Sequence, residues 1–409
     1  MLPSLRTLRS LALPALILAA VIVLAQSTAH AQGWDAGGSA GVETRIFLDD
    51  PAWPGQADDV QSSIILEGDF RWRSADRRHQ LVVVPWARID STDEERTHAD
   101  LREGFYRYIG DTFTLETGLI KVFWGVTESR HLVDIINQTD LVEDSDGEDK
   151  LGQPALRLTS QRDWGRLEFF VLPGFRERTF PGRDGRLRGP LPVTEAPLYE
   201  HADEERHIDL AARWSHFLGD WDLGLAAFHG TDREPVFTVS DSGDSLHPLY
   251  RIITQVSADV QLTRGPWLWK GEAIVREGQG DTFGAFSGGL EYTFYGITAS
   301  GADLGVLAEY HLDGRDSDPA IAPPTAFDND IFLGGRLALN DINDTSILGG
   351  AVIDTENGST AALIEAERRF GSYIFLELEG RFTLNVDERD ALFPADRDDA
   401  LTLRLTRHF

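Results

Sequence analysis

The residues that could do covalent or acid–base chemistry are few and scattered. The 409 residues include 11 histidines and no cysteine, which excludes a thiol nucleophile and a thiolate metal site. His207, His216 and His229 are near one another in sequence, but their spacing makes no obvious catalytic pair, and no His-Glu-x-x-His motif is present. We therefore predict that the protein is not an enzyme, with no catalytic residues and no cofactor.

The residues from Asp144 onward match the start of a calcium-binding loop but not its end. Asp144, Asp146 and Glu148 place oxygen ligands at alternate positions around a glycine bend. The twelfth position of an EF-hand loop is a bidentate glutamate, and here it is Ala155. The sequence therefore predicts no metal site, and a surface Ca²⁺ site is left open as the alternative.

The strongest signal for solute binding is a 32-residue stretch, residues 174–205. Its second half is acidic, and its glycines and prolines suit a loop that folds back on itself. Its first half carries five arginines: Arg176, Arg178, Arg183, Arg186 and Arg188. The hypothesis is a constriction loop that bends into a pore and contacts anionic solutes through these arginines; the alternative is an extracellular flap.

A second candidate for pore lining lies between Trp124 and Asp140. Its hydrophobic residues, among them Leu132 and Ile136, are too apolar for a free surface loop, so we expect them to pack against or inside the fold. Trp124-Gly125 followed by a cluster of Asp, Ile and Asn resembles a segment of porin-like outer-membrane families. The polar residues expected to face the lumen, and the arginines expected to partner them, are Asp134, Asn137 and Asp140 with Arg157 and Arg166.

In the segments that position these residues, apolar and polar side chains alternate with a period of two residues. In residues 64–73, Ile64, Leu66 and Phe70 share one face, whereas Glu67 and Asp69 lie on the other. Many segments run 10–16 residues, which suits strands that cross a membrane and exceeds the usual strands of a soluble β-sandwich. We predict strands at 34–48, 60–73, 78–91, 97–108, 112–125, 153–160, 164–173, 206–217, 220–230, 249–263, 266–277, 283–296, 301–312, 327–340, 343–354, 359–370, 372–386 and 399–409.

The gaps between these segments alternate in length. Gaps such as 126–152 and 174–205 are long, and the intervening ones, such as 161–163 and 264–265, are brief. Short periplasmic turns and long outer loops are typical of bacterial outer-membrane barrels. The predicted fold class is an all-β, transmembrane, antiparallel up-and-down β-barrel of about 18 strands, with 16 strands as the alternative.

The two ends of the chain agree with this fold. Residues 1–31 have a positive start, an apolar run and Ala29-His30-Ala31, which predicts a cleaved signal peptide and a barrel over residues 32–409. Leucines alternate from Leu401 to a terminal Phe409, which resembles the C-terminal signature that the barrel insertion machinery of the outer membrane reads as a strand. Arg407 departs from that signature, and near a membrane edge an arginine can extend to water.

The net charge of the chain limits the classes of partner that it can bind. The formal net charge of −29 argues against nucleic acid, whose phosphates would be repelled. Acidic loops such as 49–59 suit a lipopolysaccharide surface bridged by divalent cations, and plain solubility explains them equally well. The predicted partners are thus outer-membrane lipid and lipopolysaccharide, with a homotrimer or a monomer as the assembly.

The function that follows from this architecture is a passive one. Eighteen strands enclose a lumen wide enough for water. We predict a porin-like channel in the bacterial outer membrane for small polar or anionic solutes. A barrel component of an envelope export system is the first alternative, and an outer-membrane hydrolase is the second.

Overall fold

The computed structural model describes residues 33–409, and these residues form one closed antiparallel β-barrel. The predicted signal peptide, residues 1–31, lies outside the described residues. The barrel in residues 33–409 has 18 strands: β1 (Trp34–Phe47), β2 (Val60–Arg73), β3 (His79–Asp90), β4 (His98–Ile109), β5 (Thr114–Ile120), β6 (Gln153–Arg162), β7 (Gly165–Leu172), β9 (Asp209–Leu218), β10 (Trp221–Thr231), β13 (Ile252–Arg264), β14 (Trp267–Glu277), β15 (Phe283–Phe294), β16 (Asp303–Asp313), β17 (Asn329–Ala338), β18 (Ser346–Asp354), β19 (Thr360–Phe370), β20 (Ile374–Leu384) and β21 (Ala400–His408).

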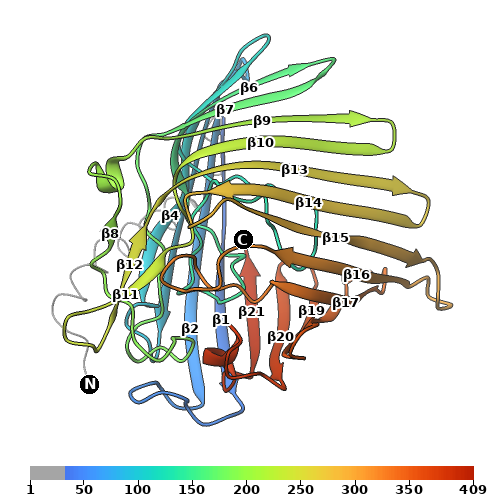
Figure 1. Cartoon of the computed structure of the whole chain (residues 1–409). Coiled ribbons are helices and arrows are strands. Elements are labelled where there is room, and N and C mark those ends of the chain that lie inside the picture. The colour runs from blue at the N-terminus through green and yellow to red at the C-terminus, as the bar shows by residue number, and fades with distance from the viewer. Residues whose placement is uncertain (1–32) are drawn as a thin grey trace.

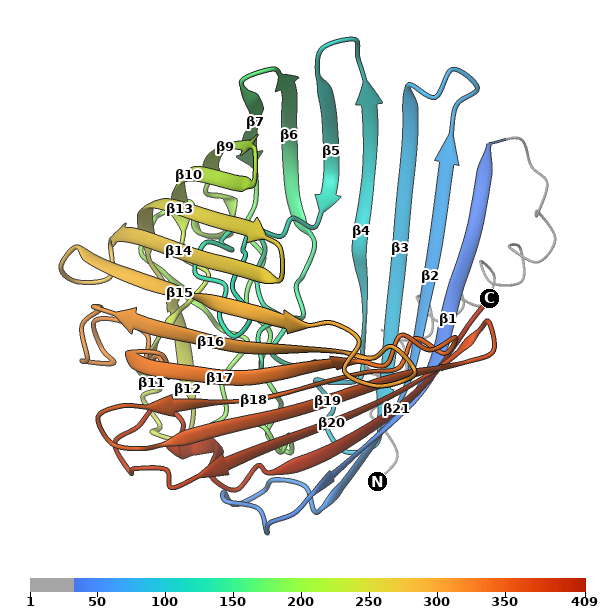
Figure 2. The same ribbon diagram turned by 90° about the vertical axis from the view of Figure 1, so that its right-hand side faces the viewer.

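The first and last strands close the barrel. β1 pairs with β2 on one side and with β21 on the other, from Ser39 opposite His408 to Phe47 opposite Ala400. The terminal Phe409 adds two backbone hydrogen bonds, because its N–H donates to the Gly38 carbonyl and its carbonyl accepts from the Gly38 N–H. Figure 2 shows β1 and β21 side by side. The ring therefore has no free sheet edge at which further strands could add.

The predicted strand count is confirmed, and the alternative of 16 strands is wrong. Most boundaries agree with the sequence prediction to within a few residues. The main exception is β5, which was expected over 112–125 and ends at Ile120. Its predicted second half leaves the wall because Val122 and Trp124 are buried inside the barrel.

Turns and loops lie at opposite ends of the barrel. The turn end has connections as short as Gly219-Asp220 and Gly265-Pro266, in which Gly219 (φ 63°) and Gly265 (φ 60°) adopt the left-handed backbone that tight hairpins need. The loop end carries the long connections 48–59, 121–152, 173–208, 232–251, 314–328 and 385–399. In Figure 1 the turns lie toward the upper right, and the loops toward the lower left and bottom.

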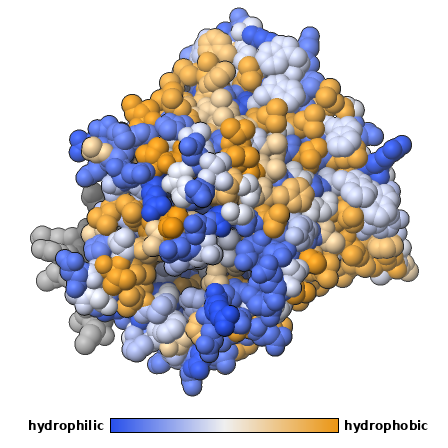
Figure 3. All heavy atoms as spheres, viewed as in Figure 1, coloured by the Kyte–Doolittle hydropathy of each residue, from blue (hydrophilic) through white to orange (hydrophobic). Residues whose placement is uncertain are grey.

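The outer face of the barrel is apolar. The predicted alternation holds on β14, where Trp269 and Val275 are exposed outward while Glu272 and Arg276 are buried inside. Figure 3 shows hydrophobic residues gathered over the strands and hydrophilic residues at the loop end. Exposed aromatic residues surround the turn end: Phe113, Trp164, Phe217, Trp221, Trp267, Phe294, Tyr295, Phe370 and Tyr373. An apolar band edged by aromatic rings is typical of a barrel embedded in lipid.

Two long loops form a small sheet outside the barrel wall. β8 (Leu198–Tyr199) pairs in parallel with β12 (Leu246–Tyr250), which pairs antiparallel with β11 (Val236–Val239). The described residues also contain two short 3₁₀ helices, η1 (Glu204–Arg206) and η2 (Phe393–Ala395). No helix within residues 33–409 is long and apolar enough to span a membrane.

Candidate functional site

The lumen is divided by residues 121–152, here called the crossing segment. Near its start the segment is held by β14, where the Glu272 carboxylate accepts hydrogen bonds from Val126 N–H (2.6 Å) and Thr127 N–H (3.0 Å). Near its end it reaches β3, where Arg88 lies 2.6 Å from Glu143. In the ring of 18 strands, β3 lies opposite the β14–β16 wall. The segment therefore spans the barrel from wall to wall.

The apolar residues of the crossing segment form a core inside the lumen. Leu132, Val133 and Ile136 are buried with inward-facing residues of the wall such as Phe228 and Ile274. The prediction that this stretch packs within the fold is therefore confirmed. Burying these side chains and their neighbours fixes the segment as a partition, because apolar surface removed from water stabilises by about 25 cal/mol per Å².

The polar residues of the segment that were expected to face the lumen are buried. The Asn137 amide accepts from Val122 N–H (2.8 Å) and donates to the carbonyls of Ile120 and Leu151 (2.8 Å each). Asp140 pairs with Arg102 of β4. The prediction of open lining is wrong for both, because backbone that leaves the wall must have its own polar groups satisfied in the interior.

The side chain of Asp134 is buried as well. Its carboxylate accepts from Trp124 N–H at 3.3 Å and lies 3.6 Å from the Lys150 ammonium group. Burial raises the pKa of Asp134 above its ordinary value. Asp134 is thus part of the support of the crossing segment and lies away from open water.

Arg157 and Arg166 do not partner these three residues, which corrects the sequence prediction. Arg157 pairs with Glu168 on β7 and lies 3.1 Å from Glu116 on β5, and Arg166 lies 2.9 Å from Glu168. Both arginines line a polar cavity of about 380 Å³, the side cavity, on the β5–β13 side of the crossing segment. They are lumen-lining residues, as expected, but their charges are paired along the wall.

The arginine-rich connection runs across the mouth of the barrel as residues 173–208, here called the cover loop. Arg186 is 2 % exposed and donates to the carbonyls of Asp49 (2.6 Å) and Arg397 (2.8 Å), with its guanidinium over the Phe47 ring. Arg188 donates to the carbonyl of Pro54 at 2.7 Å. These two arginines attach the cover loop to the loops on either side of β1. Because both side chains are buried, the prediction that they contact anionic solutes is wrong.

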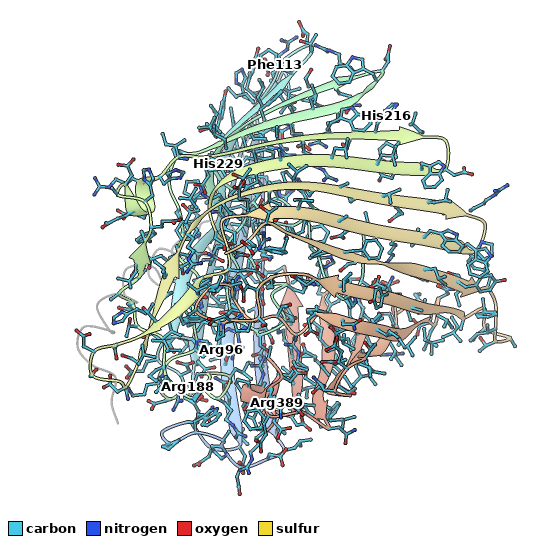
Figure 4. All side chains as sticks on the ribbon, in the orientation of Figure 1. Arg96, Phe113, Arg188, His216, His229 and Arg389 are labelled. Carbon is cyan, nitrogen blue, oxygen red and sulfur yellow. The ribbon has the colours of Figure 1, made fainter. Side chains whose placement is uncertain are left out.

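The other arginines of the cover loop have different surroundings. Arg176 lies 2.9 Å from Asp100 on β4, and Arg178 donates to the Gln138 amide oxygen at 3.2 Å. Arg183 is exposed at the surface. Figure 4 places Arg188 at the loop end of the barrel with Arg96, whereas Phe113 and His216 lie toward the turn end. The cover loop thus lies on the crossing segment from outside, which is intermediate between the predicted constriction and the predicted flap.

A second cavity of the lumen lies on the other side of the crossing segment. It is a cavity of about 630 Å³, here called the main cavity, between residues 127–148 and the wall from β17 to β21. Arg381 of β20 projects into it and lies 2.7 Å from Asp146 and 2.5 Å from Glu379. Arg45 of β1 lies 2.6 Å from Asp144. The neighbouring strands β17 to β19 add an apolar stretch of wall made of Phe332, Leu348, Val352 and Leu363.

The sequence analysis did not predict a network of ion pairs that lies behind the main cavity. Glu43 on β1 is 2 % exposed and accepts from Arg88 (2.8 Å), Arg96 (2.9 Å) and Arg404 (2.6 Å). Glu143 of the crossing segment also lies against Arg88. The alternating pattern predicts inward charges on many strands. It does not show which of these strands face one another across the lumen.

Two carboxylate-rich clusters in residues 33–409 have the spacing of metal ligands. One is His98, Asp140 and Glu143, and the other is Asp328, Asp330 and Asp354 at the loop end. The first is already compensated by Arg102 and Arg88. Asp144 and Asp146, at the start of the incomplete calcium loop, have their oxygens paired with Arg381.

Solved structures similar to this one are outer-membrane barrels. Wzi of Escherichia coli, described as a carbohydrate-binding barrel involved in group 1 capsule assembly, shares 10% identity over 99% of this chain and 89% of its own, with a TM-score of 0.51. OccK11 of Pseudomonas aeruginosa shares 11% identity over 92% of this chain and 95% of its own, with a TM-score of 0.50. OmpT of Vibrio cholerae, in a trimer form, shares 10% identity over 92% of this chain and 99% of its own, with a TM-score of 0.46.

The likenesses to Wzi and OccK11 confirm the predicted fold, and at such low identity they show the fold alone. No sequence-family model matches the chain, and no curated protein matches it. The functional assignment therefore depends on the geometry of the lumen.

Proposed function

We propose that this protein is an outer-membrane channel for the passive diffusion of small polar solutes. The observation that carries the proposal is the main cavity, which lies inside a closed barrel between the crossing segment and the wall from β17 to β21. A partition that leaves one side of the lumen open narrows a wide barrel to the dimensions of a small solute. Charged residues within the passage hold water there and discriminate among solutes.

The location follows from the outer surface. The apolar outward faces of the strands and the aromatic residues of the turn end fit the hydrocarbon and the interface of a bilayer. Acidic loops at the opposite end suit contact with lipopolysaccharide through divalent cations. Phe409 completes the pairing of β21 with β1, which supports a role of this terminal strand in recognition by the barrel insertion machinery. A homotrimer stays a prediction.

Planar bilayers containing the purified, refolded protein test the proposal. The expected result is stepwise ohmic current in KCl, together with swelling of protein-loaded liposomes in small sugars. Absence of both would contradict a passive channel. Copurification with a periplasmic or inner-membrane protein, without intrinsic conductance, would favour a component of an export system instead.

A hydrolase is the second candidate, because one contact has the geometry of a nucleophile and its base. Ser129, at the edge of the main cavity, lies with its hydroxyl 2.8 Å from His311 Nε2. The same hydroxyl is 2.8 Å from a Glu309 oxygen, and His311 Nδ1 faces the Ser287 hydroxyl rather than a carboxylate. Ser39, within a Gly-x-Ser-x-Gly match at 37–41, lies inside β1 and not on the strand-to-helix turn that such a motif needs.

This arrangement favours anchoring over catalysis. Glu309 takes the position of proton acceptor for Ser129, and its carboxylate also accepts from the backbone of the crossing segment. Labelling by a fluorophosphonate probe decides the matter, because an activated serine reacts with it. Labelling that Ser129→Ala abolishes would support the hydrolase, and no labelling is expected if the contact only anchors the segment.

A further inference from the structure

The main cavity has more negative than positive groups. Its lining includes eight carboxylates, two arginines and one histidine, and two of the carboxylates, Glu128 and Asp398, are paired with basic residues outside the lining. Arg381 is shared by Asp144, Asp146 and Glu379, so one positive charge faces three negative ones. Arg45 compensates only Asp144. The wall and the crossing segment therefore present an excess of negative charge to the same passage.

Two further carboxylates increase this excess. Glu365 of β19 lines the cavity, and no basic group lies within ion-pair distance of its carboxylate among residues 33–409. Glu148 faces His131, whose imidazole is 3.2 Å away and carries a charge only when protonated. Low-dielectric walls around a charged passage concentrate the field and raise the local concentration of counter-ions. Cations are thus favoured over anions at this point.

The barrel wall next to Glu365 is apolar, which is unusual for an inward barrel face. Phe332 of β17, Leu348 and Val352 of β18, and Leu363 of β19 line the cavity there. In the register of β18 and β19, Leu348 lies opposite Glu365, and Leu363 is two positions from Glu365 on the same face of β19. The Phe332 ring lies over Gly350 so closely that a side chain there would collide with it. A solute in the passage therefore meets the carboxylate of Glu365 and an apolar surface side by side on the same wall.

We propose that the channel selects small organic cations that carry an apolar group, such as alkylammonium ions. The inference rests on the proposed function and gives it a solute class. The ammonium head is held by the uncompensated carboxylates around Glu365, while the alkyl part lies on the Phe332–Val352 wall. This class is opposite in charge to the anionic solutes expected from the arginines of the cover loop.

The first test is the reversal potential of single channels under a tenfold KCl gradient. The expected sign is that of cation selectivity, and the potassium-to-chloride permeability ratio is expected to fall at least about twofold in Glu365→Gln. Glu388→Gln is the matched control, because Glu388 is exposed on the outer loop 385–399 and lies away from the cavity lining. Its ratio is expected to equal that of the unchanged protein.

The second test adds alkylammonium chlorides from methyl to pentyl to the same channels. The concentration that halves the potassium current is expected to fall about twofold or more for each added methylene, since the chain leaves water for the apolar wall. Alkylsulfonates of equal length are the control of opposite charge and are expected not to block. Val352→Thr keeps the shape of the side chain and is expected to flatten the dependence on chain length.

The outcomes separate the two proposals. Current with anion selectivity, or with a ratio insensitive to Glu365→Gln, would overturn the inference and leave the channel intact. A block that does not depend on alkyl length would overturn the assignment of the apolar wall. Absence of current in any salt would overturn the proposed function itself, and the solute class with it.

Discussion

At the scale of single residues, buried charges position the crossing segment. Glu272 is 1 % exposed, and its two oxygens accept from Val126 N–H, Thr127 N–H, the Thr127 hydroxyl (2.7 Å) and Val133 N–H (3.2 Å). A wall carboxylate that receives several donors from one peptide stretch fixes both its place and its direction. A buried donor that loses its partner costs about 1–3 kcal/mol, so this one side chain has a large share in the rigidity of the segment.

Glu272→Ala is expected to loosen the segment without preventing barrel formation, because no ladder hydrogen bond uses the side chain. Single-channel recordings should show larger current noise and a conductance that fluctuates between levels. Glu277→Ala, at an exposed position of the same strand, is the control and should leave the recordings unchanged. A quiet, unchanged channel in Glu272→Ala would show that the segment is held by other contacts.

At the scale of elements, the cover loop is attached both to the crossing segment and to the rim. Thr179 bridges to Asp140, and Gly182 N–H donates to the Asp93 carboxylate of loop 91–97 (3.0 Å). The loop thereby covers the partition from outside, and Leu187 belongs to the lining of the main cavity. Its length serves to reach from one side of the mouth to the other.

Deletion of residues 178–200 is expected to raise single-channel conductance, because it removes Leu187 from the cavity and frees the outer surface of the crossing segment. Deletion of residues 241–244, at the tip of the β11–β12 hairpin and away from the cavity lining, is the control and should have no effect. Unchanged conductance after the larger deletion would show that the cover loop does not restrict the passage.

The elements were largely predictable from sequence, and the contents of the lumen were not. Alternation along strands such as 60–73 and 267–277 reports a local property, namely which face meets lipid, so strand positions and number follow from it. Asn137 was expected to face the lumen and Arg186 to contact anionic solutes, yet both side chains form hydrogen bonds with backbone groups of other parts of the chain. Polar residues that fill a lumen and polar residues that line an open one are of the same types. Only their contacts in three dimensions distinguish the two roles.

At the scale of the whole molecule, the crossing segment divides the lumen of a wide barrel between two unequal cavities. The partition runs from the β14–β17 wall to the β1–β4 wall, and the two sides of the lumen differ in character. The side cavity contains basic residues from several strands, whereas the main cavity contains excess carboxylates and an apolar wall. Figure 1 and Figure 2 show how the long loops gather at one end of this ring.

Cation selectivity is expected to weaken as the pH falls from 8 to 5. Burial raises the pKa of Asp398 to about 7, so this lining carboxylate loses its negative charge within this window. Burial lowers the pKa of His131, but the hydrogen bond to Glu148 and the nearby negative charges together outweigh burial and raise this pKa, so His131 gains positive charge as the pH falls. Both changes reduce the negative excess, so the reversal potential under a KCl gradient should shift toward zero. Selectivity that increases toward pH 5 would contradict the assignment of these groups to the passage.

The most direct test asks whether ions pass through the main cavity. The chain has no cysteine, so a single engineered thiol is addressed without interference. We expect the current of Glu365→Cys channels to fall sharply when a membrane-impermeant, positively charged methanethiosulfonate is added, whereas Ser215→Cys, which lines the side cavity, should conduct as before. Loss of current in Ser215→Cys channels with no change in Glu365→Cys would contradict the account, because the ions would then pass on the other side of the crossing segment.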